Sequence, residues 1–314
     1  KWFMAAFLGF IFMIGIGVTS YHRIRKLFSY ETWWVIHLYS YIGIALAFMH
    51  EITNGVMFIN SELLKNWWIF YTASIFTILI TYRIIVPLRL TLTDKPQVTK
   101  VTRENRDTVT VSIRTNKRKA MKAKGGQFFN LRFLAGNKWW EAHPYSMSRV
   151  PKDGVLQFTV KELGDHSSWL KSLRPGTRVS LEGPYGNFTA DRLVGDKVIL
   201  IAGGIGVTPL KAIVQSLPSV SHGVLLWRVS RKDDVFMLSD IEKLCQARGI
   251  DFKTVIGSRI HHQNWLQKEL GHLPDISTYE VFLCASKGLI DDSKRGLKQL
   301  GIPETSIYTE EFEF

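Results

Sequence analysis

The chain has 314 residues, and the uneven distribution of its charges excludes a fully soluble protein. Residues 1–90 hold only ten of the 67 lysine, arginine, aspartate and glutamate residues, so an apolar first third precedes a normally charged remainder. The net charge of +13 suits a membrane protein with basic cytoplasmic flanks, and no nucleic-acid motif accompanies the scattered basic residues. We therefore expect a lipid bilayer, and no nucleic acid, as a partner.

Three apolar segments, residues 2–21, 32–50 and 66–82, are long enough for transmembrane helices, which need about 20 apolar residues. The loop at 22–31 is basic, whereas the loop at 51–65 carries two glutamates and one lysine. Because basic residues accumulate on the cytoplasmic side, we expect the first loop and everything after the third span to be cytoplasmic. The prediction is an integral protein of the plasma (cell) membrane with its soluble part inside.

This topology starts the first helix outside the membrane, yet the sequence begins with Lys1 and runs directly into apolar residues. We expect an odd number of helices upstream, so that residues 1–90 form the C-terminal half of a six-helix bundle. The two cysteines, Cys245 and Cys284, both lie in the soluble part, which argues against a disulfide framework and favours a reducing cytosolic side.

The second span contains two histidines, His37 and His50, thirteen residues apart. Ionisable side chains inside a span are functional candidates, and a neutral imidazole can be an axial ligand of haem iron. The rise of about 20 Å between them suits one haem near each leaflet, but an ideal helix places them about 140° apart, so a tilt, a kink or partners on different helices is required. Haem-binding and purely structural histidines both remain open.

Residues 91–193 are predicted to form an antiparallel β-barrel, because short β-rich runs alternate with turn residues. These runs are residues 98–105, 108–114, 125–133, 156–163 and 178–186.

Residues 194–314 alternate apolar strands with helices, which predicts a doubly wound parallel sheet of the α/β class. The strands are expected at residues 197–204, 223–230 and 279–286, and the helices at 207–217, 238–248 and 288–300.

The first strand of that sheet leads through a glycine-rich turn into a helix. Glycines allow the backbone to approach a pyrophosphate, which the amides and the dipole of a helix N-terminus favour. We predict a dinucleotide site formed by Gly203, Gly204, Gly206, Val207, Thr208 and Pro209.

Three motifs follow one another along the soluble part: H-P-Y-S at residues 143–146, G-P-Y-G at 183–186 and G-G-I-G-V-T-P at 203–209. Their order resembles the ferredoxin-reductase superfamily. With the histidine-bearing helices in front, nearly the whole chain resembles the NADPH oxidase and ferric reductase family, including its prokaryotic NADPH oxidases.

The resemblance implies that the barrel binds FAD. G-Q-F at residues 126–128 matches the first barrel signature, and H-P-Y-S matches the flavin motif, in which Tyr145 packs on the isoalloxazine and Ser146 bonds near the flavin N5. A strand edge is the alternative reading of these two residues, and a solvated lysine is that of Lys161. The implied FAD residues are His143, Pro144, Tyr145, Ser146, Lys161, Ser167 and Ser168, the last three in the segment around the pyrophosphate.

The second strand of the parallel sheet ends at Ser230 and Arg231. An acid near this position would meet the ribose hydroxyl of NAD, whereas an arginine accommodates a 2′-phosphate. We therefore predict NADPH as the electron donor, with NADH left open by Asp233 and Asp234 nearby.

Two residues are implied to act at the nicotinamide. Cys284 follows an apolar strand where the family places a cysteine, although C-A-S replaces the usual C-G-P and a structural cysteine is the alternative. The family ends in an aromatic residue stacked on the flavin; Glu310 and Phe312 match its E-x-F ending, so Phe312 is preferred to Phe314.

Together these features predict an enzyme, a superoxide-producing NAD(P)H oxidase. Electrons would pass from cytosolic NADPH through FAD and two b-type haems, the inner one on His37 and the outer one on His50, to external oxygen. The partner histidines would lie outside this sequence. The alternatives are a ferric (metal-chelate) reductase with the same carriers and a membrane-anchored flavin reductase without haem.

Two basic segments carry further hypotheses. The run at residues 114–124 could form a patch for anionic lipid or nucleic acid, or be a solvated loop. Arg23, Arg25 and Lys26 could dock against the flavin domain or reach lipid headgroups. No motif indicates a protein partner.

Overall fold

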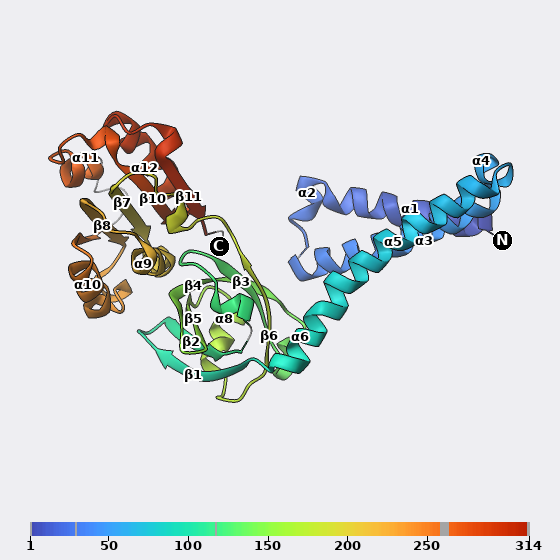
Figure 1. Cartoon of the computed structure of the whole chain (residues 1–314), viewed down its shortest axis with the longest axis horizontal. Coiled ribbons are helices and arrows are strands. Elements are labelled where there is room, and N and C mark those ends of the chain that lie inside the picture. Colours follow the sequence, from blue (N-terminus) through green and yellow to red (C-terminus); the bar gives the residue numbers. More distant parts are fainter. Residues whose placement is uncertain (1, 29, 117, 258–263, 313–314) are drawn as a thin grey trace. The chain divides into compact units, whose positions relative to one another are not determined.

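The computed structural model describes residues 2–28, 30–116, 118–257 and 264–312 (Figure 1). The chain divides into two compact units, Lys1–Val86 and Pro87–Phe314. The boundary predicted after residue 90 falls inside helix α6 (Val86–Asp94), at whose first residue the first unit ends. Phe314, the rejected candidate for the flavin-covering aromatic residue, lies outside the described residues.

The first unit is helical. Three of its helical stretches, Phe3–Ser20, Val35–Asn54 and Glu62–Ile85, are long and apolar enough to cross a membrane. Each predicted span is therefore helical, and the second helix extends beyond the predicted residues at both ends. The helices are α1 (Trp2–Ser20), α2 (His22–Arg25), α3 (Tyr30–Asn54), α4 (Val56–Ile59) and α5 (Glu62–Ile80), followed by a π-helical turn (Thr81–Ile85) and α6.

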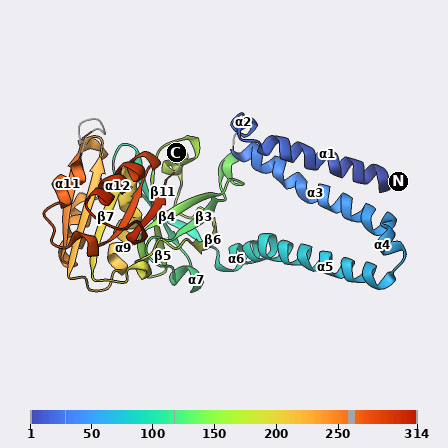
Figure 2. The ribbon, with the colours of Figure 1, turned by 90° about the horizontal axis from the view of Figure 1, so that it is seen from above.

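Helices α1 and α3 lie side by side (Figure 2), and glycines allow their close contact. A Cβ atom added to Gly9 would lie 2.8 Å from the Gly43 carbonyl oxygen, and one on Gly43 would lie 3.3 Å from that of Gly9. Small residues of this kind are typical of helix pairs in lipid. The large apolar side chains point outward instead; Phe10 is 61% exposed and Phe70 66% exposed.

The second unit begins with a six-stranded antiparallel sheet of strand order β1-β2-β5-β4-β3-β6. The outer strands share the bridge between Gln97 and Arg178 rather than a continuous ladder among the described residues, so the edges of the sheet meet at one end. One buried apolar cluster fills its interior. The strands are β1 (Gln97–Arg103), β2 (Thr108–Arg114), β3 (Phe128–Phe133), β4 (His143–Lys152), β5 (Val155–Lys161) and β6 (Val179–Tyr185), with short helices α7 (Arg118–Met121) and α8 (Asp165–Trp169).

Strand β4 is absent from the five predicted runs, although it carries the H-P-Y-S motif. Pro144 and Pro151 weaken its β-pattern, since proline cannot donate a ladder hydrogen bond. Pairing with β3 on one side and β5 on the other overrides that local signal. The strand edge considered for Tyr145 and Ser146 is in fact an inner strand of the sheet.

A five-stranded parallel sheet of order β11-β10-β7-β8-β9 completes the second unit. Strands β9 and β11 and helix α11 were not predicted from the sequence; both strands lie at edges and carry charged residues on their exposed side. The elements are β7 (Lys197–Gly203), α9 (Val207–Ser216), β8 (His222–Val229), α10 (Leu238–Ala247), β9 (Ile250–Ile256), α11 (Trp265–Leu270), β10 (Glu280–Ala285), α12 (Lys287–Gln299) and β11 (Ile307–Glu311).

Buried apolar clusters cover both faces of this sheet, as a doubly wound fold requires. Val198, Leu200 and Ala202 belong to the cluster that includes α9 and α10 residues, whereas Ile199 and Ile201 belong to the cluster with α11 and α12 residues. The chain proceeds from β7 outward through β8 to β9 and then returns to β10 on the other side. The carboxyl ends of β7 and β10 therefore form the switch point, where α/β sheets bind ligands.

The two sheets of the second unit are joined closely through α9, which packs on β4. A Cβ atom on Gly125 would lie 2.0 Å from the Ala212 carbonyl oxygen of α9, so only glycine fits there. The Val150 N–H of β4 donates to Gln215 Oε1 of the same helix at 2.9 Å. The antiparallel and parallel sheets thus form one compact body.

Candidate functional site

The H-P-Y-S motif is held in the middle of the antiparallel sheet. Within β4, His143 and Tyr145 share one face and pair in register with Leu131 and Phe129 of β3. The Tyr145 hydroxyl lies 2.9 Å from Nδ1 of His166, which is on α8. The imidazoles of His143 and His166 are 3.8 Å apart between centroids and tilted by 40°. The fold therefore places His143 and Tyr145 in contact with His166 of the G-D-H-S-S segment at residues 164–168.

Burial governs the protonation of this cluster. Burial first, then His143 and Lys138, lowers the pKa of His166 to about 3, so the imidazole is neutral at physiological pH. Burial and then the Glu141 carboxylate raise the pKa of Tyr145, so its hydroxyl keeps its proton. The bond between the two side chains is accordingly one between neutral groups.

Two buried nitrogen atoms of the cluster, His143 Nε2 and His166 Nε2, make no hydrogen bond to any of the described residues. His143 Nε2 lies 3.5 Å from the Glu141 carboxylate, and one donor atom from each of these three residues lies within 4.8 Å of the others. Glu141, His143 and His166 could hold a metal ion. The two orphan nitrogens equally suit a polar cofactor that enters beside β4.

The serines predicted near the pyrophosphate form the start of α8. Ser167 Oγ accepts from the backbone N–H groups of Leu163 and Gly164 at 2.8 and 3.0 Å, and it donates to the Gly164 carbonyl. The backbone N–H of Ser168 donates to the same carbonyl oxygen. Ser167 therefore shapes this turn, and contact of either serine with a cofactor stays a prediction.

Lys161, predicted to contact FAD or to be solvated, instead forms ion pairs with two aspartates. Its Nζ lies 3.2 Å from Asp234 Oδ1 and 3.7 Å from Asp107 Oδ2, so it connects the end of β5 to the loop after β8. The Asn105 side chain adds a bond to the Asp233 carbonyl at 3.3 Å. The ammonium predicted to meet FAD is thus engaged in an ion pair between the two sheets.

Arg231, predicted to bind a 2′-phosphate, shares this carboxylate. Its backbone N–H donates to Asp234 Oδ2 at 3.1 Å, and its Nε lies 3.6 Å from the same oxygen. Burial opposes ionisation of Asp234, but Lys161 and Arg231 outweigh it and lower the pKa of that carboxyl. The Arg231 side chain is 76% exposed and Ser230 is exposed, so both can meet a solvent-borne ligand.

The glycines after β7 have different structural roles. A Cβ atom on Gly206 would lie 2.0 Å from the Cys284 carbonyl oxygen, and one on Gly203 would lie 2.7 Å from Ala285 Cβ, so both permit close packing on β10. Gly204 has φ +52 and open space around its Cβ position. Gly204 is therefore where a ligand can approach the backbone.

The other predicted residues of this turn face inward. Val207, Thr208 and Pro209 are buried, and the Thr208 hydroxyl donates to the Ile205 carbonyl at 3.0 Å. Their side chains build the start of α9, and any contact of this turn with a dinucleotide would be made by its backbone.

Cys284 and Phe312 meet at the switch point. Cys284 pairs with Glu310 in the β10–β11 ladder, and the Phe312 N–H donates to the Ala285 carbonyl at 3.1 Å. The Cys284 side chain is fully buried, and burial, then Glu310, raises the pKa of its thiol well above the ordinary value. Cys284 is thus a protonated thiol in the core, and Phe312 is half-buried above the same apolar cluster.

The two helix histidines make different contacts. His37 Nδ1 lies 2.8 Å from the Trp33 carbonyl oxygen, and its Nε2 lies 2.8 Å from Ser20 Oγ of α1. His50 Nδ1 lies 3.2 Å from the Asn54 amide, and its ring packs edge-on against Phe3 at 6.2 Å. Both nitrogens of His37 are engaged within the helices, so its ligation of haem remains a prediction.

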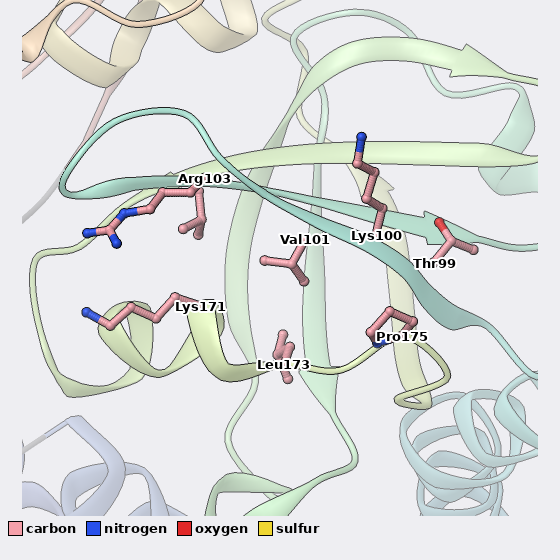
Figure 3. Close-up of a pocket in the computed structure, with 8 residues that line it drawn as sticks. Thr99, Lys100, Val101, Arg103, Lys171, Leu173 and Pro175 are labelled. Carbon is pink, nitrogen blue, oxygen red and sulfur yellow. The ribbon is translucent and has the colours of Figure 1, made fainter.

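A cavity of about 390 Å³ lies elsewhere, between β1 and the turn after α8 (Figure 3). Lys100, Arg103 and Lys171 line it, and none of the predicted site residues does. Lys171 pairs with Glu162 at 3.0 Å, and Arg103 donates to backbone carbonyls of the following turn. The cavity is therefore separate from the candidate site.

The basic run at residues 114–124 includes the short helix α7. Ala120 and Ala123 are buried in the antiparallel sheet, and Lys124 forms an ion pair with Asp191. These contacts tie part of the run to the fold, and its role as a lipid or nucleic-acid patch stays a prediction.

Sequence reasoning gave no site role to Glu141 or His166, and it named Asp234 only as a nearby acid that leaves NADH open. A local signal existed for the last two, since His166 stands inside the G-D-H-S-S segment and Asp234 follows the predicted arginine by three positions. Their partners, however, lie 21 and 73 residues away along the chain. Such contacts become visible only once the chain is folded.

Residues 95–189 match the FAD-binding domain family. Component C of the methane monooxygenase of Methylosinus trichosporium is 31% identical over 109 residues, which is 33% of this chain and 32% of that protein. The xylene/toluene monooxygenase electron transfer component of Pseudomonas putida is 28% identical over 183 residues, 54% of this chain and 52% of that protein. The chain thus spans between a third and about half of the length of these relatives.

Solved structures agree on the fold. The ferredoxin reductase of carbazole 1,9a-dioxygenase has a TM-score of 0.59 at 22% identity and covers 70% of this chain and 69% of its own. A ferredoxin NADP+ reductase from Neisseria gonorrhoeae, solved with FAD and NADP, has a TM-score of 0.56 at 17% identity and covers 69% of this chain and 97% of its own. The second unit therefore has the two-domain fold of ferredoxin-reductase-like FAD and NAD(P)H-binding proteins. Together with the match to the FAD-binding domain family, this fold supports binding of FAD and of NAD(P)H.

Proposed function

We propose that this protein is a membrane-bound flavin-dependent oxidoreductase that moves electrons from cytosolic NADPH to an acceptor outside the membrane. The observation that carries the proposal is the convergence, in one compact unit, of the β4 motif and the switch point that joins Gly204, Cys284 and Phe312. The first matches a flavin site, and the second is where a parallel sheet binds a dinucleotide.

The residues beside β4 fit FAD. The buried His166 Nε2 makes no hydrogen bond to the described residues and could accept or donate one to a polar cofactor, and Tyr145 and Ser146 can hold a planar ring and its edge. Bound FAD would supply the ability to accept two electrons together and release them singly. His143, Pro144, Tyr145 and Ser146 would hold it, with Ser167 and Ser168 near its phosphates.

The residues at the switch point fit NADPH. The backbone at Gly204 is open to a pyrophosphate, and Ser230 with the exposed Arg231 can take a 2′-phosphate. Cys284 and Phe312 would border the nicotinamide. NADH remains the weaker alternative, because Asp234 already pairs with Arg231 and Lys161 and so does not offer a free carboxylate to a ribose hydroxyl.

The helices support a place in the plasma membrane. Their large apolar side chains are exposed on the outside of the first unit, and such a surface needs an apolar surrounding. The basic loop before α3 supports a cytoplasmic side for the second unit. This arrangement would let the helices conduct electrons outward.

His37 and His50 would each help to hold the iron of a b-type haem, which would supply one-electron transfer when bound. For His37 the Trp33 carbonyl can only accept, so Nδ1 carries a proton and Nε2 is the atom that could bind iron once Ser20 moves. Oxygen, yielding superoxide, is the acceptor we favour, with ferric chelates as the alternative for the same carriers.

The experiment is the optical spectrum of the full-length protein, purified with the helices that would supply the partner histidines, before and after anaerobic addition of NADPH. We expect flavin and bis-histidine haem bands, reduction of both by NADPH, and loss of haem bands in His37→Ala and His50→Ala. His22→Ala, on the short helix α2, is the matched control and should keep them. Flavin reduction without any haem band would leave the anchored flavin reductase; a chain that takes up no flavin contradicts the proposal.

The acceptor is tested separately on the same preparation. Superoxide-dependent reduction of cytochrome c, suppressed by superoxide dismutase, is the expected result. Faster reduction of a ferric chelate under anaerobic conditions would instead identify a ferric reductase.

A further inference from the structure

We propose that His166 is a positioning residue for the flavin, holding Tyr145 and His143 of the H-P-Y-S motif in place from α8. The inference rests on the proposed function, because it concerns the flavin site in β4. No motif assigned His166 this part, since it lies 21 residues from Tyr145 along the chain.

The contacts of His166 are directed at the motif. Its Nδ1 is 2.9 Å from the Tyr145 hydroxyl, and its ring lies against that of His143 with centroids 3.8 Å apart. Tyr145 and His143 occupy the same face of β4, so a single imidazole contacts both side chains of that face. Tyr145 can therefore neither rotate nor withdraw without breaking the bond to His166.

The histidine itself is fixed from behind. It is only 9% exposed, and its ring packs against Trp169 at 5.8 Å and Phe133 at 6.5 Å between centroids. The Ser167 hydroxyl, on the next residue, accepts from the backbone N–H groups of Leu163 and Gly164 at the start of the same short helix. A side chain held this firmly can transmit its position to Tyr145.

The remaining nitrogen of His166 is the atom of the cluster to which a polar ligand could bond. Nε2 is buried and has no hydrogen-bond partner among the described residues, and the same holds for His143 Nε2. Buried polar atoms are rarely left unsatisfied in a complete site. The hydroxyl of Tyr145, by contrast, is already satisfied, which leaves its ring face as the part available to the flavin.

The test is a double-mutant cycle on the intact chain, with FAD affinity measured by fluorescence titration of the flavin-stripped protein. Tyr145→Phe and His166→Phe each remove the hydrogen bond and keep an aromatic ring. A neutral hydrogen bond contributes on the order of 1 kcal/mol, so each should weaken FAD binding roughly fivefold. Because both remove one shared bond, the double variant should be no weaker than either single variant.

A second pair of variants distinguishes positioning from general destabilisation. The Asn amide in His166→Asn reaches the place of Nδ1, whereas the longer His166→Gln reaches that of Nε2. His166→Asn should retain the FAD affinity and the visible circular dichroism of the bound flavin, and His166→Gln should lose both. His222→Asn is the control, because His222 is exposed and lies at the first residue of β8, in the other sheet.

Equal behaviour of the Asn and Gln variants, or losses that multiply in the double variant, would overturn the inference. If His166→Phe fails to fold, the comparison of His166→Asn with His166→Gln still tests the inference, because both of these variants keep a polar side chain. If the unaltered chain binds FAD but the double-mutant cycle shows no coupling, the positioning role of His166 is refuted and the proposed function stands. Failure of the unaltered chain to bind FAD removes the proposed function together with this inference.

Discussion

Phe312 is the residue at which the flavin and nicotinamide sites would meet. Its backbone is fixed to β10 through the Ala285 carbonyl, while its half-buried side chain packs on the core of the parallel sheet. An aromatic side chain placed over the flavin must leave before the nicotinamide can take its place. Because the backbone of Phe312 is fixed, only its side chain would have to move, and the free energy of displacement is that of moving the ring.

Removal of this ring should therefore tighten nicotinamide binding. In Phe312→Ala we expect the apparent KM for NADPH to fall about tenfold, equivalent to about 1.4 kcal/mol, and turnover to fall because oxidised nucleotide leaves slowly. Steady-state and stopped-flow reduction of the flavin measure both. Phe312→Trp is the control that keeps an aromatic face, and kinetics unchanged from wild type in the alanine variant would remove Phe312 from the site.

Gly206 makes a second residue-scale prediction, on stability. The Cβ of Gly206→Ala would lie 2.0 Å from the Cys284 carbonyl oxygen, so β10 or the start of α9 must shift. We expect a loss of roughly 2 kcal/mol or more, as for overpacked sites. Gly164→Ala, where φ is −169 and no atom lies within 4 Å of the added Cβ, should change the melting temperature little. Equal melting temperatures for the two variants would contradict the close contact.

At the scale of elements, one carboxylate joins the two sheets of the second unit. Asp234, in the loop after β8, binds Lys161 at the end of β5 and Arg231 in its own loop. The predicted FAD lysine and the predicted 2′-phosphate arginine are thus coupled through a side chain that is only 10% exposed. Binding of a phosphate at Arg231 would compete with this pair.

The coupling should appear in the pH dependence of stability. The folded pKa of Asp234 is lowered, so its stabilisation is fully present above the unfolded value of about 3.9 and is lost as the pH falls through the folded value. In Asp234→Asn we expect a loss of about 1 to 2 kcal/mol at pH 7 that shrinks at the lowest pH. Thermal melts over a pH series measure it, with Asp233→Asn as the exposed neighbour. A pH-independent difference would show that the ion pair is not its source.

At the scale of the whole molecule, the second unit contains what a flavin reductase needs. The three buried apolar clusters found among the described residues all lie within Pro87–Phe314. The helices present apolar side chains outward and carry both predicted haem ligands. Under the proposed function, electron input and electron conduction would therefore belong to separable parts.

A chain reduced to residues 87–314 should then fold, remain soluble, bind FAD and reduce ferricyanide with NADPH at a rate close to that of the intact chain. It should carry no haem and produce little superoxide from oxygen. Analytical ultracentrifugation and absorbance assays measure these properties. An aggregated or flavin-free fragment would show that the helices contribute to the reductase itself.

Much of this organisation is predictable from sequence because it is written in local patterns. The sparse charges of residues 1–90 predict the three helices, and alternating strand and helix predict the parallel sheet, both confirmed by the structure. Strand β4 was not predicted because Pro144 weakens its β-pattern. Strands β9 and β11 were not predicted because edge strands bury only part of their surface and so show a weaker apolar pattern. The sequence predicts a closed barrel. Among the described residues, the outer strands are joined only near the Gln97–Arg178 bridge, where backbone hydrogen bonds such as that from the Val98 N–H to the Thr177 carbonyl add to it.

The sequence by itself determined the division into apolar and soluble parts and the order of the flavin and dinucleotide motifs, since both depend on neighbouring residues. Only the tertiary structure decided which side chains meet: His166 with Tyr145, Asp234 with Lys161, and Gly206 with Cys284. These contacts join residues 21 to 78 positions apart, and no local pattern encodes such a distance. They arise where α8 contacts β4, where the loop after β8 meets the end of β5, and where the turn after β7 packs on β10.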